Sequence, residues 1–360
     1  MNVLMKPALN PLEKLNNLLL NEMLSLNSVI LAHLKSDVPL VSKVIEHILN
    51  AGGKQIRPML TLACQRLFGD LNQDSLRLGA SVELIHTATL LHDDVIDGSD
   101  LRRGKDTANA IWGNTMGVLG GDFLFSRAFQ LMVSVKTPGV LNILADALSL
   151  IAEGEVLQLS HSHDINLSSE IYFKIATRKT AVLFDAACRT GGMTLNISNE
   201  QLNLLSEYGQ NLGLAFQITD DILDYLPLQN YGKTPGEDFF DGKITLPVIL
   251  ARTMLADTKW LSLFDQGVCR SDDDFKKLVQ LFCAGGVFNA CFDRAFHYAK
   301  VARDAIKPMP PSPIRDVLEQ LPSYVVTRAI EAFGVISESL GQTIAQSLDV
   351  SPIVPQSLSA

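Results

Sequence analysis

Two short stretches of the chain share one pattern of aspartates, and this pattern restricts the possible folds more than any other feature. Each stretch places three carboxylates at positions i, i+1 and i+4 directly after an apolar segment, and the two triplets are Asp93-Asp94-Asp97 and Asp220-Asp221-Asp224. In a helix, the first and last members of a triplet lie one turn apart on the same face. Two like charges about 6 Å apart repel each other by roughly 3 kcal/mol at an effective dielectric near 20. Both segments must therefore lie where cations offset this repulsion.

The rest of the composition narrows the choice of cation and of partner. Hard oxygen ligands favour Mg²⁺ over Zn²⁺. The 5 cysteines include no CxxC pair, so we expect reduced thiols in a cytoplasmic protein rather than a disulfide framework or a zinc cage. The net charge of −9 argues against a nucleic-acid partner. The first residues contain no secretory signal, and no apolar run approaches the ~18 residues of a membrane span.

Hydrophobic residues recur with the helical period along nearly every long segment, and no convincing series of alternating strands is present. The sequence therefore predicts an all-α fold, with one helical domain over residues 11–348 and flexible ends at 1–10 and 349–360. The expected helices cover residues 11–34, 41–49, 59–68 (opened by Pro58), 74–97, 116–134 (interrupted near Gly120 and Gly121), 140–160, 170–193 and 199–226.

Basic residues lie close to these helices. Lys54 and Arg57 stand at an expected helix N-terminus, where free N–H groups favour anions, so they form either a phosphate site or an ordinary basic loop. Arg102 and Arg103 follow the first triplet within a short basic loop, which is either a solvated salt-bridge patch or a clamp on a phosphorylated ligand.

Two further segments carry lysines. Lys179 and Thr180 precede an apolar stretch, and they form either another phosphate contact or part of an ordinary surface. Residues 231–243 form a long polar loop with the composition of a mobile lid, which would bring Lys233 and Lys243 to the site; the alternative is a plain connection between helices.

Taken together, these motifs resemble those of the trans-isoprenyl diphosphate synthases. The resemblance rests on the two aspartate triplets, on Gly-Gly-Lys-Gln-Ile-Arg-Pro at 52–58, on the Arg-Arg-Gly that follows the first triplet and on Lys179-Thr180. The segments 85–94 and 152–159 are similar, more narrowly, to bacterial octaprenyl-type synthases that make quinone side chains. The similarity runs from about residue 40 to about residue 330. It departs from the family at Gln55, where many relatives have a second basic residue, and does not explain the tail.

The resemblance implies a single-domain isoprenoid-synthase bundle, a homodimer, in which the triplets face each other across the mouth of a central cavity. Three Mg²⁺ ions would bridge them to the diphosphate of an allylic substrate, with Asp93, Asp97, Asp220 and Asp224 as ligands and Asp94 and Asp221 in support. Residues matched to the allylic diphosphate are Arg102, Lys179, Lys233 and Lys243. Those matched to isopentenyl diphosphate are Lys54, Arg57, His86 and Arg103, and those matched to the region of the developing carbocation are Thr180 and Gln217.

The same resemblance predicts a long product. Ala88 and Thr89 are small, whereas short-chain members of the family commonly carry aromatic residues at these positions upstream of Asp93. Phe129 and Met132 are candidates for the floor of the product tunnel, and their alternative role is ordinary core packing. We expect a product of about C40 for quinone side chains, and peripheral membrane contact would serve its release.

The same residues leave a few other functions to consider. A shorter-chain farnesyl or geranylgeranyl synthase stays open, since it differs only in product length. A His-Asp metal phosphohydrolase would use His92 and Asp93, but the remaining histidines have no convincing partner aspartates. A non-catalytic partner subunit would have lost one triplet, and a terpene cyclase would lack Lys54 and Arg57.

Overall fold

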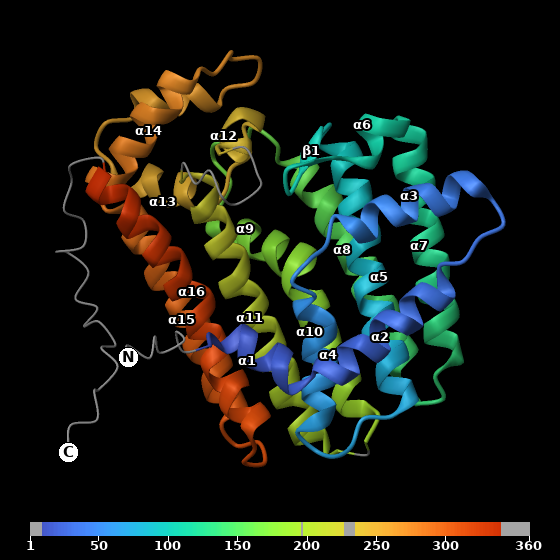
Figure 1. Ribbon diagram of the computed structural model, residues 1–360. Coiled ribbons are helices and arrows are strands. Elements are labelled where there is room, and N and C mark those ends of the chain that lie inside the picture. The colour runs from blue at the N-terminus through green and yellow to red at the C-terminus, as the bar shows by residue number, and fades with distance from the viewer. Residues whose placement is uncertain (1–8, 196, 227–234, 340–360) are drawn as a thin grey trace, which may run out of the picture.

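The computed structural model describes residues 9–195, 197–226 and 235–339, and the regular structure within these ranges is almost entirely helical, which confirms the all-α fold class (Figure 1). Within them, the strands are β1 (Leu101–Arg102) and β2 (Lys105–Asp106), which pair in an antiparallel hairpin. This hairpin contains the basic loop that follows the first triplet.

The helices of the N-terminal half are α1 (Pro11–Leu18), α2 (Leu20–His33), α3 (Pro39–Asn50), α4 (Ile56–Arg66), α5 (Gln73–Ile96), α6 (Ala108–Trp112), α7 (Asn114–Ser134) and α8 (Val140–Ser160). Those of the C-terminal half are α9 (Ser169–Ala176), the π-helix η1 (Thr177–Ala181), α10 (Val182–Met193), α11 (Asn199–Asp224), α12 (Glu237–Asp241), α13 (Leu246–Met254), the 3₁₀-helix η2 (Lys259–Phe264), α14 (Asp272–Ala284), α15 (Val287–Ile306) and α16 (Pro313–Ser339).

Two sets of long helices lie side by side in the bundle (Figure 1). In one set α5 packs against α4, α7 and α10, and in the other α11 packs against α15 and α16. Helix α10 also contacts α11 and so joins the two sets. The buried hydrophobic residues accordingly form two clusters, one around α5 and α10 and the other around α11 and α15. The two aspartate triplets belong to the central helices of these two sets.

Both aspartate-bearing helices begin at a capping box, in which side chains satisfy the free N–H groups of the first turn. Asn72 and Ser75 form the box of α5, and Ser198 and Gln201 form that of α11. Each helix then runs without a break into its triplet, at the C-terminal end. The prediction of one long helix before each triplet is therefore confirmed.

The predicted interruption near Gly120 and Gly121 was wrong, because α7 is continuous through both residues. A Cβ atom on Gly121 would lie 2.2 Å from Nε2 of His92 on α5. The glycine therefore permits close packing between α7 and α5 instead of breaking the helix. Such a use of glycine depends on the neighbouring helix, so local sequence does not reveal it.

The other helices differ from those expected most clearly at three places. The segment 11–34 forms two helices, because Leu19 leaves the helical conformation with φ −114° while its side chain is fully buried. Helix α4 begins at Ile56 instead of opening at Pro58, and Gln55 before it takes a left-handed conformation with φ 47°. The segment 170–193 contains the π-helix η1 between α9 and α10.

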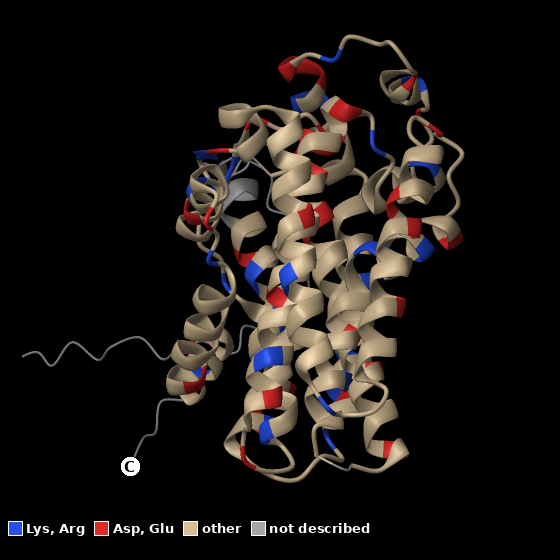
Figure 2. Ribbon diagram, turned by 90° about the vertical axis from the view of Figure 1, so that its right-hand side faces the viewer, with Lys and Arg blue, Asp and Glu red and all other residues tan. Residues whose placement is uncertain are grey.

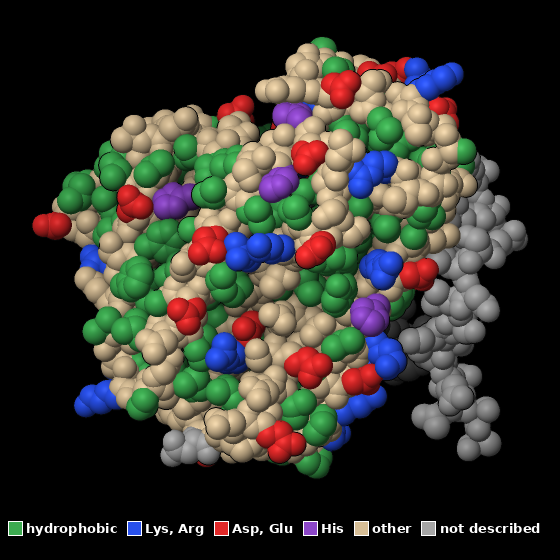
Figure 3. Space-filling view, turned by 180° about the vertical axis from the view of Figure 1, so that it is seen from behind, with side chains coloured by type: hydrophobic (Ala, Val, Ile, Leu, Met, Phe, Trp, Pro, Cys, Tyr) green, Lys and Arg blue, Asp and Glu red, His purple; other side chains and the backbone are tan. Residues whose placement is uncertain are grey.

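The surface mixes charged and apolar side chains. Figure 2 shows basic and acidic segments interspersed along the helices, without a uniformly basic face in that view. Seen from behind the view of Figure 1, hydrophobic side chains are exposed between the charged ones (Figure 3). The large exposed hydrophobic residues of α7 and α8 are Val118, Leu119, Phe129, Val133, Leu141, Val156 and Leu159. Among the described helices, none is both long enough and apolar enough to cross a membrane.

Candidate active site

The three aspartates of the first triplet, at the end of α5, differ in their surroundings. Asp94 is buried, and its Oδ1 atom accepts hydrogen bonds from Nε and Nη2 of Arg102 on β1, each at 2.7 Å. Asp93 is half-buried, and burial raises its pKa to about 6, although the positive charge of Lys179 opposes this shift. Asp97 caps the helix and is partly exposed. The outer two carboxylates therefore face the site while the middle one anchors the hairpin.

The second triplet shows the same division at the end of α11. Asp221 is buried and accepts a hydrogen bond from the hydroxyl of Tyr172 at 2.5 Å and another from Nε2 of Gln217 at 2.7 Å. Burial raises the pKa of Asp221, and the carboxylate of Asp238 adds to the effect. Asp220 is exposed, and Asp224 accepts the backbone N–H of Asp238 at 3.0 Å.

Lys243 brings the end of the first triplet together with the segment that follows the second. Its Nζ atom lies 3.2 Å from Asp97 on α5 and 3.1 Å from Asp241 on α12. Burial alone would lower the pKa of Lys243, but the carboxylates of Asp238, Asp97 and Asp241 raise it instead. The prediction that this segment is a long loop was incomplete, since it contains α12. Lys233 lies outside the described residues.

A second cationic group surrounds Arg57 on α4. Nη1 of Arg57 lies 3.2 Å from Nε2 of His86, and the guanidinium stacks 4.4 Å from the ring centre of Phe184. Burial lowers the pKa of Arg57 to about 10, so the guanidinium stays charged, whereas burial and the neighbouring arginines lower the pKa of His86 well below its usual value. Burial also lowers the pKa of Lys54, while the carboxylate of Asp220 opposes this shift. The structure therefore brings Arg57 and His86 into contact, and Lys54 shares the charged neighbour Asp220 with Arg57.

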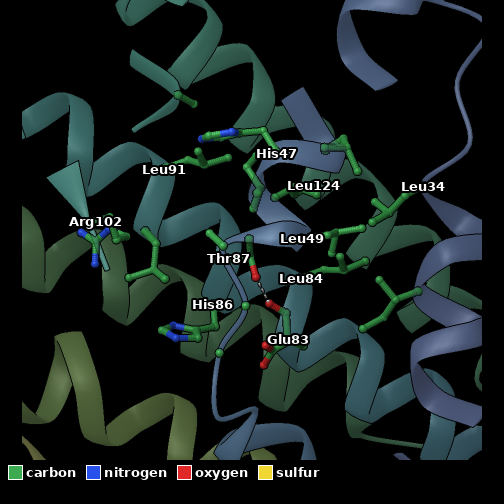
Figure 4. Close-up of a pocket in the computed structure, with 18 of the residues that line it drawn as sticks. Leu34, His47, Leu49, Glu83, Leu84, His86, Thr87, Leu91, Arg102 and Leu124 are labelled. Carbon is green, nitrogen blue, oxygen red and sulfur yellow. Dashed lines mark hydrogen bonds between the residues drawn. The ribbon is translucent and has the colours of Figure 1, made fainter. Parts of the chain in front are cut away.

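Glu83 belongs to this cationic group, and sequence reasoning missed it. It lies one turn before His86 on α5, and Figure 4 shows both side chains at the same cavity. Its Oε2 atom is buried without a hydrogen-bond partner among the described residues. Burial raises the pKa of Glu83 to about 7, although the charges of Arg57 and Arg103 oppose the shift. The spacing i, i+3 to His86 was the available signal, but a lone glutamate within an apolar helix gives no functional pattern by itself.

The hairpin places Arg102 and Arg103 differently. Arg102 is committed to Asp94, as described above, while Arg103 occupies the turn in a left-handed conformation with φ 53°. A Cβ atom on Gly53 would lie 2.9 Å from Nη1 of Arg103, so the glycine leaves room for the guanidinium beside the segment that contains Lys54. Two adjacent arginines thus serve two neighbourhoods, one at the first triplet and one beside Lys54.

The π-helix η1 carries Lys179 and Thr180, and such insertions often occur at functional sites. Nζ of Lys179 lies 2.6 Å from Oε2 of Glu155 and also contacts Gln158 on α8. The hydroxyl of Thr180 donates to Oε1 of Gln217 at 2.5 Å. Because Gln217 in turn donates to Asp221, η1 and α11 are joined by a continuous hydrogen-bonded chain. Sequence reasoning missed the roles of Glu155, Gln158 and Tyr172, whose partners are distant along the chain.

The carboxylates suit a cation that takes part of its coordination shell from the substrate. Among the described residues, no three His, Cys, Asp or Glu side chains converge closely enough to enclose a metal ion by themselves. The outer aspartates nevertheless provide only hard oxygen donors, and burial raises the pKa of Asp93 in the absence of a cation. Mg²⁺ commonly binds through one or two carboxylates, substrate phosphates and water. The donor set therefore fits Mg²⁺ bound together with a diphosphate.

The four residues assigned to product length lie in different environments. Ala88 is completely buried and Thr89 is half-buried on α5, whereas Met132 on α7 is 1% exposed. Phe129 is 43% exposed on the surface of this chain. Within a single chain Phe129 therefore does not occupy the core, contrary to its alternative role as ordinary core packing, while Met132 suits either role.

Comparisons with known proteins place this geometry in a family. Residues 38–282 match the family model of polyprenyl synthetase. Octaprenyl diphosphate synthase of Escherichia coli is 39% identical over 321 residues, which cover 88% of this chain and 99% of that protein. The all-trans-nonaprenyl-diphosphate synthase (geranyl-diphosphate specific) of Rhodobacter capsulatus is 36% identical and covers 82% of this chain and 91% of its own.

A solved structure agrees with these sequence relatives. The polyprenyl synthase of Caulobacter crescentus, complexed with calcium and isoprenyl diphosphate, superposes with a TM-score of 0.85 at 43% identity. The match covers 88% of this chain and 98% of that one. The relative thus binds a divalent cation and an isoprenoid diphosphate within the same fold.

Proposed function

The chain belongs to the polyprenyl synthetase family and is a prenyltransferase of the trans-prenyl diphosphate synthase class, and we propose that it is a long-chain member. It would add isopentenyl diphosphate repeatedly to an allylic diphosphate such as farnesyl diphosphate, giving a product of about C40 for quinone side chains. The observation that supports the proposal is that Lys243, which follows the second triplet in the chain, pairs with Asp97 of the first triplet. This family membership excludes the phosphohydrolase and favours synthesis over cyclisation.

The outer aspartates would hold the cations, with Asp93 and Asp97 on one side and Asp220 and Asp224 on the other. Mg²⁺, three ions in our proposal, would neutralise the charge that develops on the leaving diphosphate. Lys179 and Lys243 would contact the diphosphate of the allylic substrate, and Arg102 would do so from its position on Asp94. Asp94 and Asp221 would then serve mainly to position Arg102 and Gln217, respectively.

The cationic group around Arg57 would hold the second substrate. Lys54, Arg57 and Arg103 supply charge for the isopentenyl diphosphate, and His86, whose lowered pKa keeps it neutral, would supply a hydrogen bond. The allylic C–O bond breaks, the isopentenyl double bond attacks the allylic carbon, and a proton leaves to a diphosphate oxygen. Thr180 and Gln217 would direct neutral dipoles toward the cation that forms. No protein nucleophile is required, and the fixed charges account for catalysis by electrostatic preorganisation.

The assignment of a long product rests on Ala88 and Thr89. Both are small, and both lie on the turns of α5 directly before Asp93, where a growing chain would pass. The relatives described above include octaprenyl and nonaprenyl synthases, which supports a long product. A farnesyl or geranylgeranyl synthase remains the second candidate, and Phe129 and Met132 remain proposed determinants of the chain-length limit.

The test is direct. The purified protein is incubated with farnesyl diphosphate, isopentenyl diphosphate and Mg²⁺, and the product length is measured by chromatography. We expect a product of about C40. A product that stops at C15 or C20 would refute the role given to Ala88 and Thr89, and release of phosphate without elongation would refute the synthase itself.

We also propose an oligomeric state and a location for the chain. The exposed hydrophobic residues of α7 and α8 would suit a homodimer interface, since exposed apolar patches often mark sites of association. We propose that residues 11–348 act as one domain in the cytoplasm, with peripheral membrane contact when the product leaves. The tail at 349–360 lies outside the described residues, as do residues 1–8 of the N-terminal segment.

A further inference from the structure

Lys243 takes its position from the short helix α12, which lies at the end of the bundle that also carries β1 (Figure 1). This helix ends in a Schellman motif. The backbone N–H of Gly242 donates to the carbonyl of Phe239 at 3.0 Å, and Gly242 has the left-handed conformation that the motif requires, with φ 69°. The N–H of Lys243 donates to the carbonyl of Asp238 at 2.8 Å. The orientation of the last turn of α12 therefore decides where the lysine side chain begins.

Helix α12 has 5 residues, and helices shorter than about 12–15 residues are marginal in water, so its neighbours must hold it. At its beginning, the backbone N–H groups of Gly236 and Asp238 donate to the carbonyl and to Oδ2 of Asp224, at 2.7 and 3.0 Å. The ring of Phe239 is fully buried and packs edge-on against that of Phe264. These contacts fix the first turn and the buried face of α12.

Arg270, in the segment between η2 and α14, contacts the last turn of α12. Its Nη1 atom donates to the carbonyl of Phe240 at 3.1 Å, and its Nε atom donates to the carbonyl of Leu263 in η2 at 2.6 Å. Its Nη2 atom donates to the carbonyl of Asp265 at 3.4 Å. A Cβ atom on Gly242 would lie 2.7 Å from Nη2, so the guanidinium also packs closely against the residue before the lysine. One planar group therefore ties the end of α12 to η2.

The charge of Arg270 also acts on a partner of Lys243. Burial lowers the pKa of Arg270, and the carboxylate of Asp241 opposes this shift. Arginine keeps its charge at neutral pH, so the two groups attract each other. Asp241 also lies 3.1 Å from Nζ of Lys243, which in turn lies 3.2 Å from Asp97 of the first triplet. Arg270 is therefore connected to the lysine through the backbone of α12 and through a shared carboxylate.

We propose that Arg270 is a positioning residue for the allylic substrate: it holds the last turn of α12 so that Lys243 points at Asp97 and at the allylic diphosphate. This inference rests on the proposed function, which gives Lys243 its contact with that diphosphate. Arg270 acts through the lysine and not on the substrate itself. Loss of its guanidinium lets the end of α12 move, which misplaces the charge of Lys243 without removing it.

The test is a double-mutant cycle that combines Arg270→Met with Lys243→Met. Elongation assays should show that Arg270→Met lowers kcat/KM for farnesyl diphosphate about fivefold, less than Lys243→Met does, because the charge of the lysine remains. In the Lys243→Met background, the same substitution should cause no further loss of kcat/KM, since the two residues act as one unit. The KM for isopentenyl diphosphate should not change, because the cationic group around Arg57 holds that substrate.

Arg127→Met is the matched control. Arg127 is half-buried, as Arg270 is, and it also donates to a backbone carbonyl, that of Lys35 at 3.0 Å, but it lies on α7. This variant should keep the kcat/KM of the unmodified protein. Calorimetry with farnesyl diphosphate and Mg²⁺, without isopentenyl diphosphate, should show the same pattern in Kd without any turnover.

Urea unfolding of each variant separates positioning from a general loss of stability. Arg270→Lys keeps the charge but cannot reproduce the planar fork, so it should show the same dependence on Lys243 at a smaller size, even where Arg270→Met is too unstable to assay. Equal losses of kcat/KM with and without Lys243, or the same loss in Arg127→Met, would overturn the role of Arg270. Elongation by the unmodified protein would still support the synthase function in that case.

Discussion

The two triplets have the same spacing, but their middle aspartates are held in different ways. Asp94 on α5 pairs with a cation, Arg102, at 2.7 Å. Asp221 on α11 accepts hydrogen bonds from two neutral groups, the hydroxyl of Tyr172 and the amide of Gln217. Burial raises the pKa of Asp221. The hydrogen bonds from Tyr172 and Gln217 lower this pKa only in part, because neither group is positively charged.

This difference shows that one motif combines two kinds of carboxylate. The outer members, such as Asp93 and Asp220, are the proposed cation ligands, whereas the middle members hold neighbouring elements in place. Asp94 fixes the hairpin, through Arg102, and Asp221 joins α11 to α9 and, through Gln217 and Thr180, to η1. The outer residues should therefore respond to substitution through catalysis, and the middle residues through stability and geometry.

The largest effect should come from the outer positions. Asp93→Ala or Asp220→Ala removes an oxygen ligand from the proposed cations, and we expect kcat to fall on the order of 10³-fold, comparable to loss of one preorganised transition-state contact. Circular dichroism and thermal unfolding should remain close to those of the unmodified protein. A variant that unfolds at the same temperature and keeps normal kcat would contradict the proposal that the outer carboxylates act in catalysis and the middle ones in stability.

Substitutions at the two middle positions should lower the free energy of unfolding by different amounts. Asp94→Asn leaves Arg102 without its counterion, and we expect a loss of about 2 kcal/mol, below the usual cost of a buried pair because Arg102 is partly exposed. Asp221→Asn should cost less than about 1 kcal/mol, since burial already favours the neutral form and an amide can still hydrogen-bond. Urea unfolding of both variants measures this contrast. Equal losses would show that the two anchors are equivalent.

Lys243 tests whether the two triplets act as one site. Lys243→Met keeps the length of the side chain but removes the charge that faces Asp97 at 3.2 Å. We expect kcat/KM for the allylic diphosphate to fall roughly 10–30-fold, the equivalent of ~1.4–2 kcal/mol. Lys277→Met is a suitable control, because Lys277 forms an exposed pair with Asp273 on α14. Similar losses in the two variants would argue against a specific role for Lys243.

The sequence predicted the parts of this site that depend on local patterns. The helical period identified the long helices, and the repeated triplet predicted both ends of the proposed site. It could not reveal which aspartate of each triplet turns away from the site, because Arg102 and Tyr172 reach these positions only through tertiary packing. The close packing at Gly121 and the hydrogen bonds of Lys179 within η1 likewise depend on neighbouring helices, so local sequence gave no reliable signal for them.

Glu83 extends the comparison to a third carboxylate, whose Oε2 atom is buried. Its pKa is raised to about 7 from the ordinary value of 4.5, chiefly by burial. Between these two values the unfolded chain ionises while the folded chain retains its proton, so stability falls as the pH rises toward 7 and is constant above it. Glu83→Gln removes this dependence. The free energy of unfolding is measured in urea at about pH 5 and about pH 8. Its decrease between these two pH values should be about 1–3 kcal/mol larger in the unmodified protein than in Glu83→Gln.

The same ionisation should affect the binding of isopentenyl diphosphate. Above pH 7 the Glu83 carboxylate is charged and faces the same arginines as the substrate, so the KM of the unmodified protein should rise relative to that of Glu83→Gln. We expect the ratio of the two KM values to change roughly threefold to fivefold, equal to ~0.7–1 kcal/mol. This is the size expected for charges that interact through a partly hydrated environment. The comparison between variants at each pH cancels the titration of the substrate itself. A constant ratio of KM values from about pH 6 to about pH 8.5 would show that Glu83 acts on stability alone, as the middle aspartates do.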